Sequence, residues 1–188
     1  YDITNVNNIQ EVDRIQSNPG SGTIPHNTHV DGDFLITSYY RDGTTVHDIT
    51  YPNNMIEVGY YDSYPGSGNG FDGNWGTYPF LPSGNIISSD INSGANQAAK
   101  LLIYERQFQQ ACYLEGTVTD ANTTNAIASA NIEILTSSIS TSTNISGAYT
   151  SGVANGGTYS ILFSKPGYIS DTISAILSNG AMTTVNAQ

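Results

Sequence analysis

Residues 114–120 read Leu-Glu-Gly-Thr-Val-Thr-Asp and decide the fold, because apolar or small residues alternate there with polar ones. A period of two places alternate side chains on opposite faces of an extended chain. The stretch therefore predicts a β-strand with one buried face. The next residues, Asp120-Ala121-Asn122, are typical of the turn that ends such a strand.

Further short strands follow along the rest of the chain. Ile132 and Ile134 flank Glu133, residues 159–163 read Tyr-Ser-Ile-Leu-Phe, and turn-forming residues separate these runs. Several strands within residues 111–188 predict a small antiparallel sandwich. Gly147 and Gly167 fall at turns, where we expect a positive φ.

The first part of the chain contains an internal repeat. Tyr-Asp-Ile-Thr at 1–4 recurs as His-Asp-Ile-Thr at 47–50, and Ile-Gln-Glu-Val at 9–12 recurs as Met-Ile-Glu-Val at 55–58. The offset is 46 residues here and grows to 51 between residues 38–43 and 89–94. Short strands and turns repeated at such a period predict four-stranded β-propeller blades. We interpret Ala95–Lys100 as a lengthened loop or one helical turn.

Residues 1–110 would hold roughly two blades, whereas closed propellers need about four to eight. The ring therefore does not close within this chain. Either upstream blades are missing or copies of the chain complete one another. Because residue 1 already reads as the middle of a strand, we expect a processed product or a fragment and leave open whether Tyr1 is a natural N-terminus.

Both parts resemble known families. Residues 25–40, 46–50, 58–65, 75–84 and 89–91 resemble the LVIVD-repeat propellers of bacterial choice-of-anchor B surface proteins. That resemblance covers most of the first 105 residues, departs from the family at the insertion near Ala95, and implies export and surface attachment.

Residues 114–120, 128–134, 146–149, 157–159 and 165–168 resemble the carboxypeptidase regulatory-like domain. This resemblance implies a transthyretin-like fold with a structural or adhesive role. The sequence thus predicts an all-β chain, with incomplete β-propeller blades in residues 1–110 and a small Greek-key transthyretin-like β-sandwich in residues 111–188.

The net charge and the composition of the chain disfavour several classes of binding partner and site. The net charge is −11, which disfavours nucleic acid and anionic lipid. No apolar run is long enough for a membrane span. The single Cys112 excludes an intramolecular disulfide and a thiolate zinc cluster, and we expect it to be a buried small apolar residue.

His26, His29, Asp31 and Asp33 form the most metal-like cluster. On a strand, however, residues three apart point to opposite faces, so a strand start and a turn are the alternative. Their counterparts Trp75 and Tyr78 cannot chelate, which favours packing. Calcium is the one cofactor considered, through Asp31 and Asp33 or residues 62–72, although neither stretch has EF-hand spacing.

Two kinds of carbohydrate contact are also considered. Thr172 lies in Asp171-Thr172-Ile173, which resembles an O-glycosylation triplet of some bacterial surface proteins. The 13 Tyr residues with Trp75 would either form a sugar-stacking platform or fill sheet cores.

No catalytic constellation is visible in the sequence. We expect a noncatalytic secreted or cell-surface bacterial protein, a binding, adhesion and structural module that contacts protein or glycan. One alternative is a structural subunit of an extracellular filament or sheath that self-assembles through exposed β edges. The other alternative is a fragment of a metal-dependent propeller hydrolase.

Overall fold

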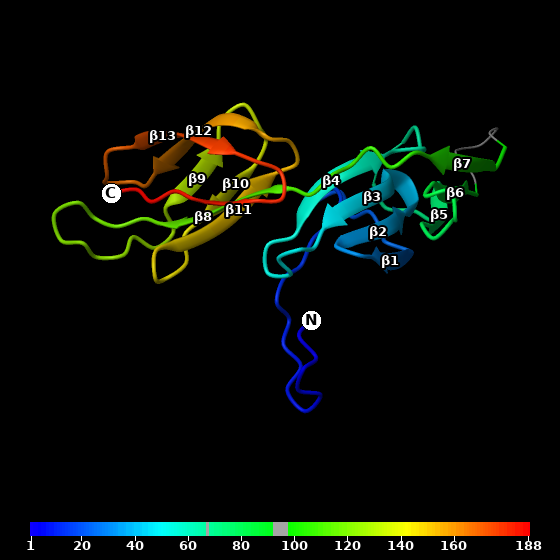
Figure 1. The fold of residues 1–188 in the computed structure, drawn as a ribbon, viewed down its shortest axis with the longest axis horizontal. Coiled ribbons are helices and arrows are strands. Elements are labelled where there is room, and N and C mark those ends of the chain that lie inside the picture. Colours follow the sequence, from blue (N-terminus) through cyan, green and yellow to red (C-terminus); the bar gives the residue numbers. More distant parts are fainter. Residues whose placement is uncertain (67, 92–97) are drawn as a thin grey trace. The chain divides into compact units, whose positions relative to one another are not determined.

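The computed structural model describes residues 1–66, 68–91 and 98–188, and the chain divides into two units, Tyr1–Phe108 and Gln109–Gln188 (Figure 1). Apart from one 3-10 turn at Tyr40–Asp42, the regular structure in these ranges consists of β-strands. The all-β prediction is therefore confirmed. The interpretation of Ala95–Lys100 falls mainly on residues 92–97, which lie outside the described residues.

The first unit begins its regular structure with a four-stranded antiparallel sheet in chain order. Its strands are β1 (Asn27–Asp31), β2 (Phe34–Tyr39), β3 (Gly43–Asp48) and β4 (Ile56–Tyr61). Only Gly32 and Asp33 separate β1 from β2, and Gly32 has φ +59°. This tight turn is the one that the sequence predicts at Asp31-Gly32-Asp33.

A second antiparallel sheet in this unit has three strands, again in chain order. They are β5 (Asn74–Tyr78), β6 (Ile86–Asp90) and β7 (Lys100–Tyr104). Ile86 from this sheet packs with Ile36 and Val46 of the first sheet in a small buried cluster. The propeller assignment stays a prediction, since the described sheets do not form a closed ring.

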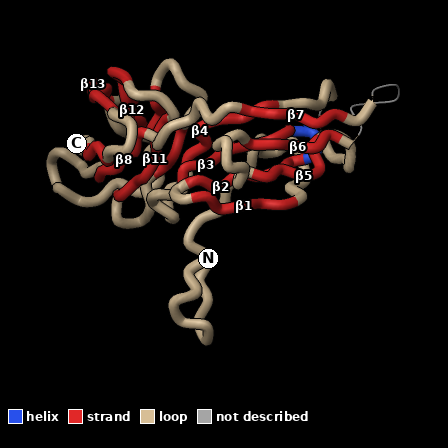
Figure 2. Tube along the Cα trace, turned by 45° about the vertical axis from the view of Figure 1, so that its right-hand side comes forward, coloured by secondary structure: helices blue, strands red, loops and turns tan. Residues whose placement is uncertain are grey.

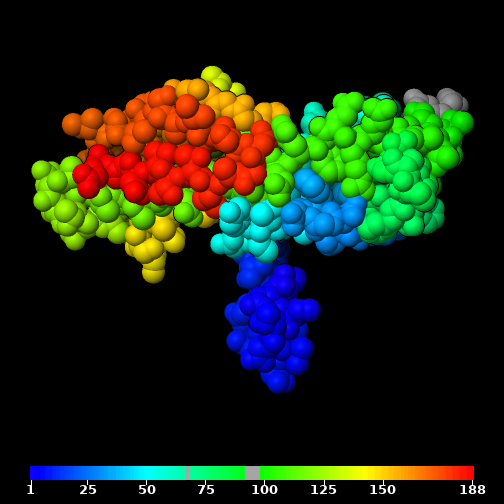
Figure 3. Space-filling model, in the orientation of Figure 1, coloured from blue at the N-terminus to red at the C-terminus, as the bar shows by residue number. Residues whose placement is uncertain are grey.

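Residues 1–16 form no regular strand and are largely exposed (Figures 2 and 3). They make one isolated antiparallel bridge, Asp2 to Gln10, and the Asn8 N–H donates to the Asn5 carbonyl at 2.9 Å. Forty-six residues later, Asp48 pairs with Ile56 in the β3–β4 ladder. The N-terminal segment thus folds as the beginning of a hairpin whose complete form is β3–β4.

The second unit is a β-sandwich of a four-stranded and a three-stranded sheet. The orders are β10-β9-β12-β13 and β11-β8-β14, with β8 central in its sheet. The strands are β8 (Cys112–Thr117), β9 (Asn131–Ile134), β10 (Ser140–Ser142), β11 (Ala148–Val153), β12 (Gly157–Ser164), β13 (Asp171–Leu177) and β14 (Met182–Thr184). Gly147 and Gly167 have φ values of +75° and +90°, which confirms the expected left-handed turns.

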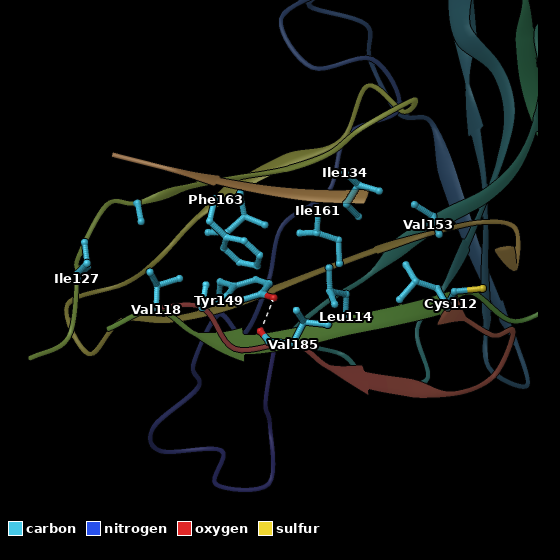
Figure 4. Close-up of a cluster of buried hydrophobic side chains, with 14 residues drawn as sticks. Cys112, Leu114, Val118, Ile127, Ile134, Tyr149, Val153, Ile161, Phe163 and Val185 are labelled. Carbon is cyan, nitrogen blue, oxygen red and sulfur yellow. Dashed lines mark hydrogen bonds between the residues drawn. The ribbon is translucent and has the colours of Figure 1, made fainter. Parts of the chain in front are cut away.

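One hydrophobic core fills the space between these two sheets (Figure 4). Leu114 from β8 faces Ile132 and Ile161 from the other sheet, and all three are fully buried. The alternation in residues 114–120 produces this arrangement, because every second residue of the strand enters the core. The Tyr149 hydroxyl also enters the core and donates to the Val185 carbonyl at 2.7 Å.

Candidate functional site

A groove of about 410 Å³ opens in the first unit between β4 and the end of β7 (hereafter the β4–β7 groove). Val58–Tyr61 form one wall, and Tyr104–Phe108 contribute most of the other. The first sheet has a fourth strand at this level, whereas the second sheet has none beyond β7 in the part of the chain that the structure describes. The unequal number of strands leaves an open hollow beside β4.

Tyrosine rings dominate the rim of the groove. Tyr60 is 72% exposed and Tyr61 is 53% exposed, and the Tyr61 and Tyr104 rings lie 5.2 Å apart at 45°. Burial raises the pKa of Tyr104, so its phenol stays neutral in ordinary conditions. Tyr rings combine an apolar face with a polar hydroxyl, a combination that suits both protein and sugar partners.

A buried polar network lies next to the groove and joins the two sheets. The Asn74 amide donates to Thr44 Oγ1 at 2.5 Å, and the Ser88 hydroxyl donates to Asn74 Oδ1 at 2.7 Å. Thr77 Oγ1 lies 3.1 Å from Ser88 Oγ and 3.2 Å from Thr44 Oγ1. All four side chains are buried. A satisfied buried network of this kind fixes the relative position of β3, β5 and β6.

The contacts of Arg106 fix the position of the residues that follow β7. Its Nε donates to the Gly84 carbonyl at 2.8 Å and its Nη2 to the Pro79 carbonyl at 2.5 Å, while Nη2 also pairs with Asp31. Phe108 then packs edge-on against Phe34, with ring centroids 4.9 Å apart. These contacts fix the path of residues 105–108, of which Glu105, Gln107 and Phe108 line the groove.

The predicted metal residues are engaged in other contacts. His26 Nδ1 donates to the Trp75 carbonyl at 2.5 Å, and the His29 ring lies edge-on to Phe80 at 5.7 Å. Asp31 pairs with Arg106, and the Asp33 carbonyl accepts a hydrogen bond from the Ile49 N–H at 2.8 Å.

In residues 1–66, 68–91 and 98–188, no three His, Cys, Asp or Glu side chains gather in a way that would hold a metal ion. The metal site at these four residues stays a prediction. In the stretch considered for calcium, Asp72 pairs with Arg41 at 2.6 Å, and Asp62 Oδ1 accepts a hydrogen bond from the Tyr64 N–H at 2.8 Å.

An acidic hollow of about 300 Å³ lies beside β4 and is lined by Asp42, Glu57 and Asp62 among others. Burial and the nearby Asp42 raise the pKa of Glu57 to about 7. Burial lowers the pKa of His47 to about 4, and its Nε2 lies 3.6 Å from Glu57 Oε2. Between those two pKa values, a neutral imidazole therefore faces a carboxyl group that is mainly protonated.

Two other sequence-predicted residues lie in the second unit. Thr172 is exposed on β13, and its N–H is within 2.7 Å of Asp171 Oδ1. O-glycosylation there stays a prediction. Cys112 is 0% exposed, in agreement with the expected buried position, and burial raises the pKa of its thiol.

Sequence reasoning did not single out the residues of the β4–β7 groove. Tyr60, Tyr61 and Tyr104 are three of the 13 Tyr residues of the chain, and the composition does not show which of these residues line a groove. A signal was nevertheless present. Residues 38–43 are followed by residues 55–58, the second copy of 9–12, whereas residues 89–94 are followed by no third copy of that stretch.

Comparison with known families bears on the second unit. Residues 113–188 match the carboxypeptidase regulatory-like domain. No curated protein matches the chain. The part of the chain that the structure describes has no helix with the length and apolar character needed to cross a membrane.

One solved structure is similar to this chain, the minor pilin GBS52 of the Gram-positive pathogen Streptococcus agalactiae. The sequences are 14% identical, the TM-score is 0.34, and the match covers 70% of this chain and 65% of that chain, less than two thirds of its length. The second unit, a sandwich of two sheets, is similar to the carboxypeptidase regulatory-like domain over residues 113–188.

Proposed function

We propose that this chain is a noncatalytic structural and binding module of a secreted or cell-surface bacterial protein. The observation that carries the proposal is the β4–β7 groove, an open surface with exposed Tyr rings on a firmly connected pair of sheets. Exposed aromatic residues on a rigid support are typical of contact surfaces.

The second unit supports the same proposal. Its matched family is a regulatory-like domain and not a catalytic one, and its core is complete within residues 109–188. A separately folded sandwich that follows an open sheet in the chain suits a protein that spaces or anchors a contact surface. The partner would be a protein or a glycan.

A structural subunit of a filament or sheath is the second candidate function. The specific observation in its favour is the edge of β7, which has no neighbouring strand beyond it among the described residues. An uncovered strand edge presents unpaired backbone groups to another chain. The hydrolase alternative has no such observation behind it.

The test uses the immobilised full-length chain and two kinds of analyte, a panel of neutral oligosaccharides and the chain itself. We compare Tyr61→Ala with Tyr168→Ala, which removes a similarly exposed Tyr (53% and 49%) from the second unit. We expect at least one analyte to bind and Tyr61→Ala alone to weaken that binding. Binding that depends on Tyr168 instead of Tyr61, or no binding of either analyte, would refute the proposed contact surface.

A further inference from the structure

We propose that residues 10–15 of one copy of this chain add to the outer edge of β7, along Leu101–Tyr104, in a second copy and complete its sheet to four strands. This inference rests on the proposed structural role and names the partner of the β4–β7 groove. Three independent features of the first unit lead to it.

The first feature is a missing strand. In the first sheet, the third strand β3 lies between β2 and β4. In the second sheet, the third strand β7 pairs with β6 alone among the described residues. The outer backbone groups of Leu101–Tyr104 face no other described strand and would accept a strand of the β4 type.

The second feature is a strand of that type at the N-terminus. Residues 10–15 align with β4, Ile56–Tyr61, at the offset of 46 residues. The preceding residues reproduce the β3–β4 turn in detail. The Thr4 N–H donates to Asp2 Oδ1 at 2.9 Å, and its counterpart Thr50 N–H donates to Asp48 Oδ1 at 2.9 Å.

Two further interactions follow the same offset. The turn hydrogen bond from the Asn8 N–H to the Asn5 carbonyl measures 2.9 Å, as does the one from Asn54 to Tyr51. The Tyr1 hydroxyl donates to Glu11 at 3.1 Å, where the complete hairpin places His47 beside Glu57. The N-terminal segment is thus set to continue as a β4-type strand, yet residues 11–15 belong to no sheet in the described structure.

The third feature is apolar exposure on the acceptor sheet. The offset of 51 residues makes Ile87 the counterpart of Ile36, and their partners across the ladder are Ile103 and Val46. Val46 is 5% exposed because the second sheet covers it, whereas Ile103 is 64% exposed. In the donating copy, the first sheet follows the N-terminal strand along the chain. That sheet would cover Ile103 of the accepting copy, as the second sheet covers Val46 within one chain.

The donated strand has a definite register. Thr44 faces Tyr61 in the β3–β4 ladder and Ser38 in the β2–β3 ladder. Ser89, the counterpart of Ser38 at the offset of 51 residues, faces Leu101, so Leu101 corresponds to Thr44. Ile15 corresponds to Tyr61 at the offset of 46 residues. We therefore place Ile15 of one copy opposite Leu101 of another. The two surfaces in contact differ, so the association is head-to-tail and either closes a ring or extends a fibre.

The direct test is cross-linking between copies. Ile15→Cys and Leu101→Cys are prepared as two separate full-length variants, mixed and mildly oxidised, with the buried natural Cys112 left in place. Residues opposite each other in a ladder are close enough for a disulfide. The control mixes Ile15→Cys with Ile176→Cys, since Ile176 is 70% exposed on edge strand β13 and Leu101 is 69% exposed on β7.

We expect the Ile15→Cys and Leu101→Cys mixture to give at least about tenfold more of the linked pair of 20.0 kDa chains than the control. Equal yields would overturn the inference. A third variant that carries both Ile15→Cys and Leu101→Cys is oxidised in parallel. An internal disulfide in that variant, with no linked pair from the mixture of the two single variants, would also overturn the inference.

A second measurement needs no cysteines. Val12→Pro removes the backbone N–H of an exposed residue in the donated strand. Sedimentation velocity should then show that self-association of this variant is at least about tenfold weaker than that of the natural chain. Val6→Pro is the matched control, because the counterpart of Val6 in the complete hairpin is Pro52. Equal association of both variants would contradict strand donation. If oligosaccharides bind through Tyr61 while neither test detects a second copy, the proposed function stands and this inference fails.

Discussion

Glu57→Gln should stabilise the first unit at pH 8 and leave its stability nearly unchanged at pH 5. Burial and Asp42 raise the pKa of Glu57 from 4.5 to about 7. The folded unit therefore holds this proton more tightly than the unfolded chain does. Stability is fully present below pH 4.5 and is lost as the pH rises through 7. Gln is a neutral residue of the same shape and does not bear this cost.

The magnitude follows from the difference between the two pKa values. Each pKa unit corresponds to about 1.36 kcal/mol, which gives an upper bound of about 3 kcal/mol for a fully buried carboxyl. The Glu57 side chain is 34% exposed, so solvent screening reduces the expected gain to about 1 kcal/mol at pH 8. At pH 5 the folded unit still binds the proton and the unfolded chain has only begun to lose its advantage from ionisation, because this pH lies just above the unfolded pKa of 4.5. With the same reduction for solvent screening, we expect only a few tenths of a kcal/mol.

The assay uses the single Trp of the chain, Trp75, which lies on β5 and reports on the first unit. Denaturant unfolding is followed by Trp fluorescence at pH 5 and pH 8 for the natural chain, Glu57→Gln and Glu105→Gln. Glu105 is an exposed carboxyl of the same unit and serves as the control. The same change in free energy at both pH values, or a loss of stability at pH 8, would refute the reasoning.

Three further predictions concern the second unit. Ile161→Ala removes a fully buried core side chain and should cost about 2–5 kcal/mol by circular dichroism in denaturant, whereas Ile145→Ala, at 94% exposure, should change little. Tyr149→Phe removes the hydrogen bond to the Val185 carbonyl and should cost about 1 kcal/mol, and a melting temperature equal to that of Tyr168→Phe would contradict this. Cys112 is buried with a raised pKa and should react with a thiol reagent only as the unit unfolds, so rapid labelling of the native chain would count against the described core.

The sandwich could be predicted from the sequence because its pattern is local. The period-two alternation in residues 114–120 identifies β8, and the side chains that it directs inward form the core. Glycines at 147 and 167 mark turns with positive φ, which few other residues adopt. The strand order, with β14 parallel to β8, depends on contacts distant in sequence and was not visible in the pattern.

The site was harder to predict for a physical reason. The β4–β7 groove depends on the different number of strands in two sheets and not on a motif. His26 and His29 are of a residue type that commonly binds metals. In the structure, His26 lies just before β1 and contacts Trp75, and His29 lies on β1 and contacts Phe80. Glu57 has a pKa raised by burial, which the sequence does not encode locally.

Hydrogen exchange at several protein concentrations tests the central claim most directly, because it observes the backbone groups of the β7 edge. With rising concentration, the account predicts that amides in residues 10–15 and 100–104 gain protection together, while those of edge strand β13 do not change. Protection of the two segments that is independent of concentration, in a chain that stays at 20.0 kDa, would contradict the claim that a second copy completes the sheet.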